Sequence, residues 1–186
     1  MTGNTGGGPH SDRSVGDAAR RGAHKIKATL LRSIDHLGVG TTVWERGDWD
    51  VLIVMDACRY DVLKHVSDPF LADADVSSHT SVASYSLEFM QRHFTDEYAA
   101  EMADTALVVA NPYTSEISTS RFTLVDEVWR SRWDESFNSV RPEPVIDRGL
   151  SVWRQRERHG AERLIIWLMQ PHRPFRSRPE WMAPGM

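Results

Sequence analysis

Hydrophobic residues gather in short runs that predict a layered α/β fold. Three runs of apolar and β-branched residues, without regular polar alternation, lie at 51–55, 105–110 and 164–169. Such runs are typical of strands that are covered on both faces of a parallel sheet. Four other segments are interpreted as helices, at 57–66, 87–94, 125–133 and 144–158. The order of these elements predicts an α/β protein with a layered, mostly parallel sheet flanked by helices.

The N-terminal region has two parts with different patterns. Residues 1–22 are rich in Gly, Ser, Thr, Asp and Arg and lack the apolar core of a signal peptide, so they predict a disordered tail. The segment 24–37 carries apolar residues at helical spacing, at Ile26, Leu30, Ile34 and Leu37. We expect this amphipathic helix to pack against the core; a membrane-surface or partner helix is the alternative. Residues 23–186 are expected to form the α/β domain.

Composition and charge favour a single globular domain and give no sign of a nucleic-acid partner or a membrane span. The chain has 186 residues, of which 40% are hydrophobic, and this suits one globular domain. A formal net charge of -4 gives no sign of a nucleic-acid partner, and no apolar run reaches the roughly 18 residues of a membrane span. Cys58 is the only cysteine, which excludes an internal disulfide and a cysteine cluster for zinc. We therefore expect a cytoplasmic protein.

Polar residues follow the three predicted strands. Asp56 ends the first, Asn111 the second and His172 the third. The carboxyl ends of parallel strands share one edge of a sheet, where ligands bind, so we expect these residues to converge. Asp56 suits a divalent cation, or else caps the following helix. Arg59 and Asp61 are too close in sequence to share a helix face, so we expect Arg59 to pair with another carboxylate or a substrate oxyanion. His172 contacts either a ligand or the local backbone.

The stretch 73–86 is rich in Ser and Thr and precedes a predicted helix. One interpretation is a set of solvated turns. The other is that a hydroxyl near residues 84–87 lies at the helix N-terminus, where backbone donors attract an oxyanion or phosphate. Beside a metal ion, such a hydroxyl acts as a nucleophile.

The segment Trp49–Asp61, with the sequence WDVLIVMDACRYD, resembles the first strand and following signature of the sulfatase-like hydrolases of the alkaline phosphatase superfamily, in particular their haloarchaeal branch. Weaker similarities lie at 81–89, at 110–112 and in QPHRPF at 170–175, which is similar to the Pro-His-x-Pro-Phe of sulfatases. The resemblance implies a metal-dependent hydrolase or transferase. Its substrates would be phosphate or sulfate esters, as small molecules or linked to glycans or lipids.

The resemblance also implies roles for individual residues. Asp56 would bind a divalent zinc, calcium, manganese or magnesium ion. Ser84, four residues before Glu88, is the first candidate for the nucleophile, and Ser86 is the second. Cys58 lies in the wrong segment to be the cysteine that sulfatases mature to formylglycine, which favours a phosphate-type hydroxyl nucleophile. The expected substrate contacts are Arg59, Asn111 and His172.

Members of this family carry a further segment with an Asp-His pair that completes the metal site. We therefore expect this chain to be a truncated, N-terminal portion of the fold. The alternative is a non-catalytic remnant or binding module with the same fold. A third alternative is that a second polypeptide or a second copy of the chain, in a homo-oligomer, completes the site, and this would require an exposed apolar sheet edge.

Overall fold

The computed structural model describes residues 40–47, 49–67, 69–71, 73–175 and 177–182. The predicted tail over 1–22 and the predicted helix over 24–37 lie outside the described residues. The strands are β1 (Val51–Met55), β2 (Thr105–Val109), β3 (Leu124–Glu127), β4 (Trp133–Asp134), β5 (Ser139–Val140) and β6 (Arg163–Leu168). The α-helices are α2 (Tyr60–Ser67), α3 (Ser86–His93), α4 (Ala99–Ala103), α5 (Trp129–Arg132), α6 (Pro142–Arg154) and α7 (Arg156–His159). Short 3₁₀ helices are η2 (Asp96–Tyr98), η3 (Pro112–Glu116) and η4 (Pro179–Met182).

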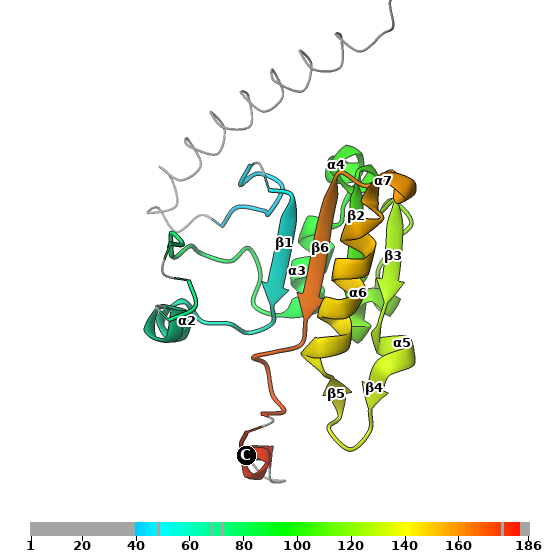
Figure 1. Cartoon of the computed structure of the whole chain (residues 1–186). Helices are drawn as coiled ribbons and strands as arrows, with labels where there is room; N and C mark the ends of the chain where they lie inside the picture. The colour runs from blue at the N-terminus through cyan, green and yellow to red at the C-terminus, as the bar shows by residue number, and fades with distance from the viewer. Residues whose placement is uncertain (1–39, 48, 68, 72, 176, 183–186) are drawn as a thin grey trace, which may run out of the picture.

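Four strands form one sheet in the order β1-β6-β2-β3, and every neighbouring pair is parallel (Figure 1). The last strand in the sequence, β6, therefore lies between β1 and β2. The remaining strands, β4 and β5, pair with each other in an antiparallel ribbon. The structure confirms the predicted α/β class with a mostly parallel sheet flanked by helices. No helix in the described part of the chain has the length and apolar character to cross a membrane.

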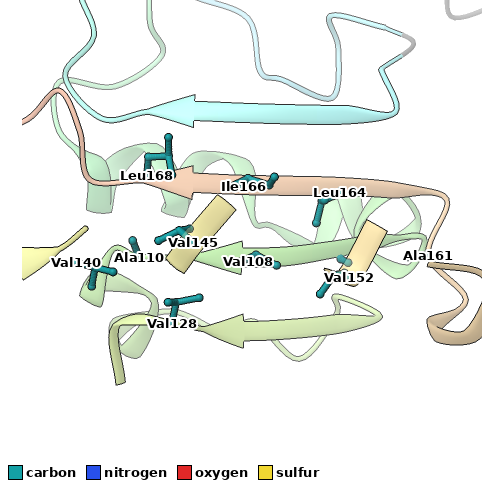
Figure 2. Packing of buried hydrophobic residues seen from close by; sticks show 11 residues of the cluster. Val108, Ala110, Val128, Val140, Val145, Val152, Ala161, Leu164, Ile166 and Leu168 are labelled. Carbon is teal, nitrogen blue, oxygen red and sulfur yellow. The ribbon is translucent and has the colours of Figure 1, made fainter. Parts of the chain in front are cut away.

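Helices cover both faces of the central strands. Helix α6 packs on one face, where Val145 and Val152 meet residues such as Val108 and Ile166 (Figure 2). Helices α3 and α4 pack on the other face, where the core includes Leu107, Val109, Ile165 and Trp167 together with Met90, Phe94 and Met102. Neighbouring residues of a strand point to opposite faces, so a strand covered on both must be apolar throughout. The uninterrupted apolar runs of β2 and β6 are explained in this way.

Strand β1 differs from the central strands. Its residues Leu52 and Val54 pack on the α3 side of the sheet, but Val51, Ile53 and Met55 are exposed on the other side. The expectation that this run is covered on both faces is therefore wrong within the described residues. Strand β1 is at the edge of the sheet, and α6 lies over β6 and β2. Helix α6 therefore does not cover the apolar side chains of β1 on that face.

The chain turns sharply after β1. Ala57 has a φ of 60°, in the left-handed region, and the N–H of Cys58 donates to the carbonyl O of Met55. This conformation is uncommon for a residue with a side chain. The following helix therefore begins only at Tyr60, later than predicted, and α2 lies away from the sheet (Figure 1).

One predicted helix is wrong. Residues 125–133 were expected to be helical, but 124–127 form β3, and only the single turn α5 follows. Strand β3 has the sequence LVDE, and both of its acidic residues have side-chain partners. Arg148 pairs with Asp126, and the Thr114 hydroxyl donates to Glu127. An edge strand with two acidic residues lacks the apolar run that identifies a buried strand from sequence.

Candidate functional site

Asp56 lies directly after β1, at the carboxyl edge of the parallel sheet. Its backbone N–H donates to the carbonyl O of Leu168 at 3.3 Å, which continues the pairing with β6. Its carbonyl O accepts from the N–H of His172 at 2.9 Å. The main chain at Asp56 is thus held by β6 and by the loop that follows β6.

Three side chains from different elements meet the carboxylate of Asp56. Its Oδ2 atom accepts hydrogen bonds from Ser86 Oγ at 2.8 Å and from Asn111 Nδ2 at 2.9 Å. The indole Nε1 of Trp167 lies at 3.5 Å, at the limit of a hydrogen bond. A single carboxylate oxygen of Asp56 therefore faces donors from three different elements. The predicted convergence of the first two strand ends is confirmed, because Asp56 and Asn111 are in direct contact.

The structure excludes the N-cap interpretation of Asp56. Helix α2 begins at Tyr60, four positions later, so Asp56 does not occupy the capping position. Its side chain instead contacts Ser86 of α3, Trp167 of β6 and Asn111, two residues after β2. Asp56 therefore joins separate parts of the fold at the edge where α/β proteins bind ligands.

Asn111 is almost fully buried, with 2% of its surface exposed. Its Nδ2 donates to Asp56, while its Oδ1 accepts from the backbone N–H of Tyr113 at 3.0 Å and so caps η3. Because both ends of the amide have partners, its orientation is fixed. The observed position of Asn111 makes it a support for the Asp56 carboxylate, and contact with a substrate stays a prediction.

Of the two serine candidates, the structure brings Ser86 to Asp56. Tyr85 is the N-cap of α3, with an extended backbone, and Ser86 is the first helical residue. Ser84 is exposed, and its backbone N–H donates to Glu88 Oε2 at 3.1 Å. This hydrogen bond, together with Arg92, lowers the pKa of Glu88. Tyr85 lies between the two serines: Ser86, after it, contacts Asp56, whereas Ser84, before it, is exposed to solvent.

The other predicted ligand contacts have different partners. Arg59 donates from Nε and Nη2 to the two carboxylate oxygens of Asp61, at 3.0 and 2.7 Å, and both side chains are exposed. The expectation that Arg59 pairs with a carboxylate other than Asp61 is therefore wrong, whereas a contact with a substrate oxyanion stays a prediction. Arg59 precedes α2 rather than lying on it, so spacing along a helix face does not apply. His172 Nδ1 lies 2.7 Å from the carbonyl O of Arg173, so this ring nitrogen is engaged with local backbone.

The loop after β6 carries an open cavity of about 500 Å³. It is lined by Gln170, Pro171, His172, Pro174, Phe175 and Ser177. All of these residues come from one loop, and the lining is largely apolar. The backbone of His172 also contacts Asp56, so this hollow borders the Asp56 site without including its carboxylate.

A divalent metal ion normally needs three or more protein ligands. Among the described residues, no three His, Cys, Asp or Glu side chains come together as a candidate site. The Oδ2 atom of Asp56 is already surrounded by donors, which compete with a cation for its lone pairs. The described residues therefore do not by themselves fit the divalent metal that the resemblance implies.

Trp167 is the member of the site that the sequence analysis did not single out. It is the second-last residue of β6 and is 2% exposed. Its ring meets the edge of Phe89 at a centroid distance of 5.5 Å, which places the indole between α3 and the Asp56 carboxylate. A buried indole N–H requires a hydrogen-bond acceptor. A tryptophan near the carboxyl end of a predicted buried strand is therefore the sequence signal that could have indicated this contact with Asp56.

Comparisons with protein-family models, with curated proteins and with solved structures found no match.

Proposed function

We propose that this chain carries the nucleophile part of a phosphate- or sulfate-ester hydrolase or transferase, with the hydroxyl of Ser86 as the attacking group. The observation that carries the proposal is the hydrogen bond from Ser86 Oγ to Asp56 Oδ2, 2.8 Å long, at the carboxyl edge of a parallel sheet. The resemblance of residues 49–61 to sulfatase-like hydrolases supports the reaction class. A hydroxyl paired with a carboxylate is a recurring arrangement for an activated nucleophile.

In the proposed reaction, Ser86 Oγ attacks the phosphorus or sulfur of the ester. Its proton passes to Asp56 Oδ2, the new bond joins Oγ to phosphorus or sulfur, and the bond to the leaving alcohol breaks. The departing oxygen takes a proton from water. Attack by water on the seryl ester then releases phosphate or sulfate, or attack by another alcohol completes a transfer, and Ser86 regains its proton. Asn111 holds the carboxylate in line with the hydroxyl throughout.

The position of Ser86 also favours an anionic substrate. The first backbone N–H groups of α3 have no partner within the helix, and the helix dipole adds partial positive charge at this end. Glu88 lies in the first turn, but its carboxylate is engaged by the N–H of Ser84 and by Arg92. An ester oxyanion near Ser86 therefore meets backbone donors together with the attacking hydroxyl.

The proposed site could take up a divalent zinc, calcium, manganese or magnesium ion only with ligands beyond the described residues. Asp56 is the residue proposed to contact it, and the other ligands would have to come from residues beyond those described or from another chain. The proposed steps above therefore use only Ser86, Asp56 and water.

The second candidate function is binding of an oxyanion without turnover. It is favoured by the hydrogen bonds that Asp56 Oδ2 receives, since Ser86 and Asn111 already occupy the oxygen that should accept the serine proton. In such a binding module, Ser86 and the start of α3 would hold the anion while no bond is broken.

Steady-state hydrolysis separates the two functions. The full chain is assayed with an aryl phosphate monoester, an aryl phosphodiester and an aryl sulfate, each with and without added divalent cations. Turnover that falls by about 10³-fold in Ser86→Ala and persists in Ser84→Ala supports the catalytic proposal. Turnover that depends on Ser84 overturns the assignment of Ser86. Saturable binding of phosphate or sulfate with no turnover of any ester supports the binding module.

A further inference from the structure

The exposed face of β1 is an apolar surface without a cover in the described part of the chain. Val51 and Met55 each keep 38% of their surface exposed and Ile53 keeps 50%. These three residues lie on the same side of the sheet as α6, because the alternate residues Leu52 and Val54 pack with α3. The strand contains no charged residue, proline or bulge of the kind that protects sheet edges in other proteins.

Helix α6 supplies a wall beside this face. Gly149 sits directly against Ile166 of β6, and Arg148 pairs with Asp126 of β3, which directs that flank of α6 toward β3. The opposite flank carries Ile146, Leu150 and Trp153, because these positions lie about 60°, 100° and 40° round the helix from Gly149, on the side away from Arg148. Leu150 is 45% exposed. We call the exposed face of β1, formed by Val51, Ile53 and Met55, together with this flank of α6 the β1–α6 surface.

A second helix would fit over β1 beside α6. Helices packed side by side lie about 8–10 Å apart, and neighbouring strands about 4.8 Å apart. Helix α6 packs over β6 and β2, so a second helix beside it would lie over β1. The exposed face of β1 is about 17 Å long for five residues of strand, and a helix of 14 residues is about 21 Å long.

We propose that the segment 24–37 of this same chain docks as a helix on the β1–α6 surface. Its apolar stripe of Ile26, Leu30, Ile34 and Leu37 matches the apolar side chains of this surface. The segment ends three residues before Gly40, where the described chain begins, so it is tethered and its effective concentration is high. Trp44 and Trp49 pack on the α3 side of the sheet, so the connection would pass round the free edge of β1 to reach the other face.

Charge also favours this occupant. Residues 24–37 contain three Arg or Lys and a single Asp, whereas residues 40–186 contain 16 basic and 23 acidic residues. The segment is therefore positive and the body that would receive it is negative, and opposite net charges attract at long range.

A second copy of the chain is a poorer occupant. Antiparallel pairing of two β1 strands about Ile53 would place Asp50 of each copy opposite Asp56 of the other. Like charges directly opposite in a sheet are destabilising. Helix α2 has half-exposed Val62 and Val66, but it lies away from the sheet in this structure (Figure 1).

Methyl NMR on the full chain tests the docking. Cross-peaks between Ile34 and Ile53 methyl groups, and between Leu30 and Leu150, are expected. They disappear in Leu30→Asp and persist in Ala28→Asp, which adds the same charge on the opposite side of the segment. Cross-peaks between Val145 and Ile166 report in each variant that the core remains folded.

Three results would overturn the proposal. The first is the absence of cross-peaks between the segment and β1 in a chain whose core cross-peaks are present. The second is cross-peaks that arise only between differently labelled copies in a mixed sample, which shows that a second copy covers the β1–α6 surface. The third is cross-peaks from Val62 or Val66 to Ile53, which shows that α2 covers it.

Discussion

Ser86 Oγ donates a 2.8 Å hydrogen bond to Asp56 Oδ2, and the two residues are 30 positions apart in the sequence. Asp56 directly follows β1 and Ser86 begins α3, so this contact ties the edge of the sheet to the helix that covers it. Asn111, after β2, donates to the same oxygen. A single carboxylate oxygen thus connects three elements, and changes around it should affect both stability and chemistry.

Asn111→Asp should destabilise the fold. The new carboxylate retains the acceptor for Tyr113 N–H but loses the donor to Asp56, and it places a second carboxylate against the part-buried Asp56 carboxylate. We expect a loss of about 2–3 kcal/mol of unfolding free energy at pH 7. Urea unfolding of variant and wild type at pH 7 measures this loss, and a variant as stable as the wild type would contradict it.

His93 should make the fold less stable as the pH falls. The ring is fully buried and stacks on Phe89, and its Nε2 has no hydrogen-bond partner among the described residues. Burial lowers the pKa of His93 to about 4, against 6.5 for an exposed histidine. Between these values the unfolded chain binds the proton and the folded chain does not, so stability is lost as the pH falls from about 6.5 to 4.

The expected loss is about 3 kcal/mol over that window, from a pKa difference of about 2.5 units. Urea unfolding at closely spaced pH values gives the slope. The control is His93→Gln, which cannot titrate and should show a much flatter dependence over the same window. Equal slopes in the two proteins would mean that another group is responsible.

Gly149→Ala should destabilise the protein although alanine favours helices. A Cβ atom at this position of α6 would overlap Ile166 Cδ1 and lie 2.9 Å from its Cγ1. Overpacking of this kind costs about 1–3 kcal/mol, more than the roughly 1 kcal/mol that alanine gains over glycine in a helix. Thermal unfolding measures the balance. Adding Ile166→Val removes Cδ1 and should recover most of the loss; a double variant no more stable than Gly149→Ala would contradict this explanation.

Much of the sheet follows from the sequence, because buried strands need apolar runs. The runs at 51–55, 105–110 and 164–169 became β1, β2 and β6, and parallel pairing brought Asp56 to Asn111 as expected. Strand order was not accessible, since nothing local specifies that β6 lies between β1 and β2. Strand β3 was missed because its acidic residues are stabilised by distant partners such as Arg148.

The site itself was harder to predict than the fold. Which serine reaches Asp56 depends on the residue at which α3 begins, and Ser84 and Ser86 differ by only two positions in a stretch rich in hydroxyls. The pairing of Arg59 with Asp61 was excluded by an argument about helix faces, whereas Arg59 lies just before α2. Trp167 was passed over because its apolar character fits the core, and only the structure gives its N–H an acceptor.

The most direct test of the central claim is to locate the covalent seryl ester. The full chain is mixed with an aryl phosphate, quenched rapidly in acid and digested, and the peptides that contain Ser84 and Ser86 are analysed by mass spectrometry. The account predicts a phosphoryl group on Ser86 that is retained in Ser84→Ala and lost in Ser86→Ala, with both variants folded by circular dichroism. A phosphoryl group on Ser84, or no phosphorylated serine in a chain that hydrolyses the ester, would contradict it.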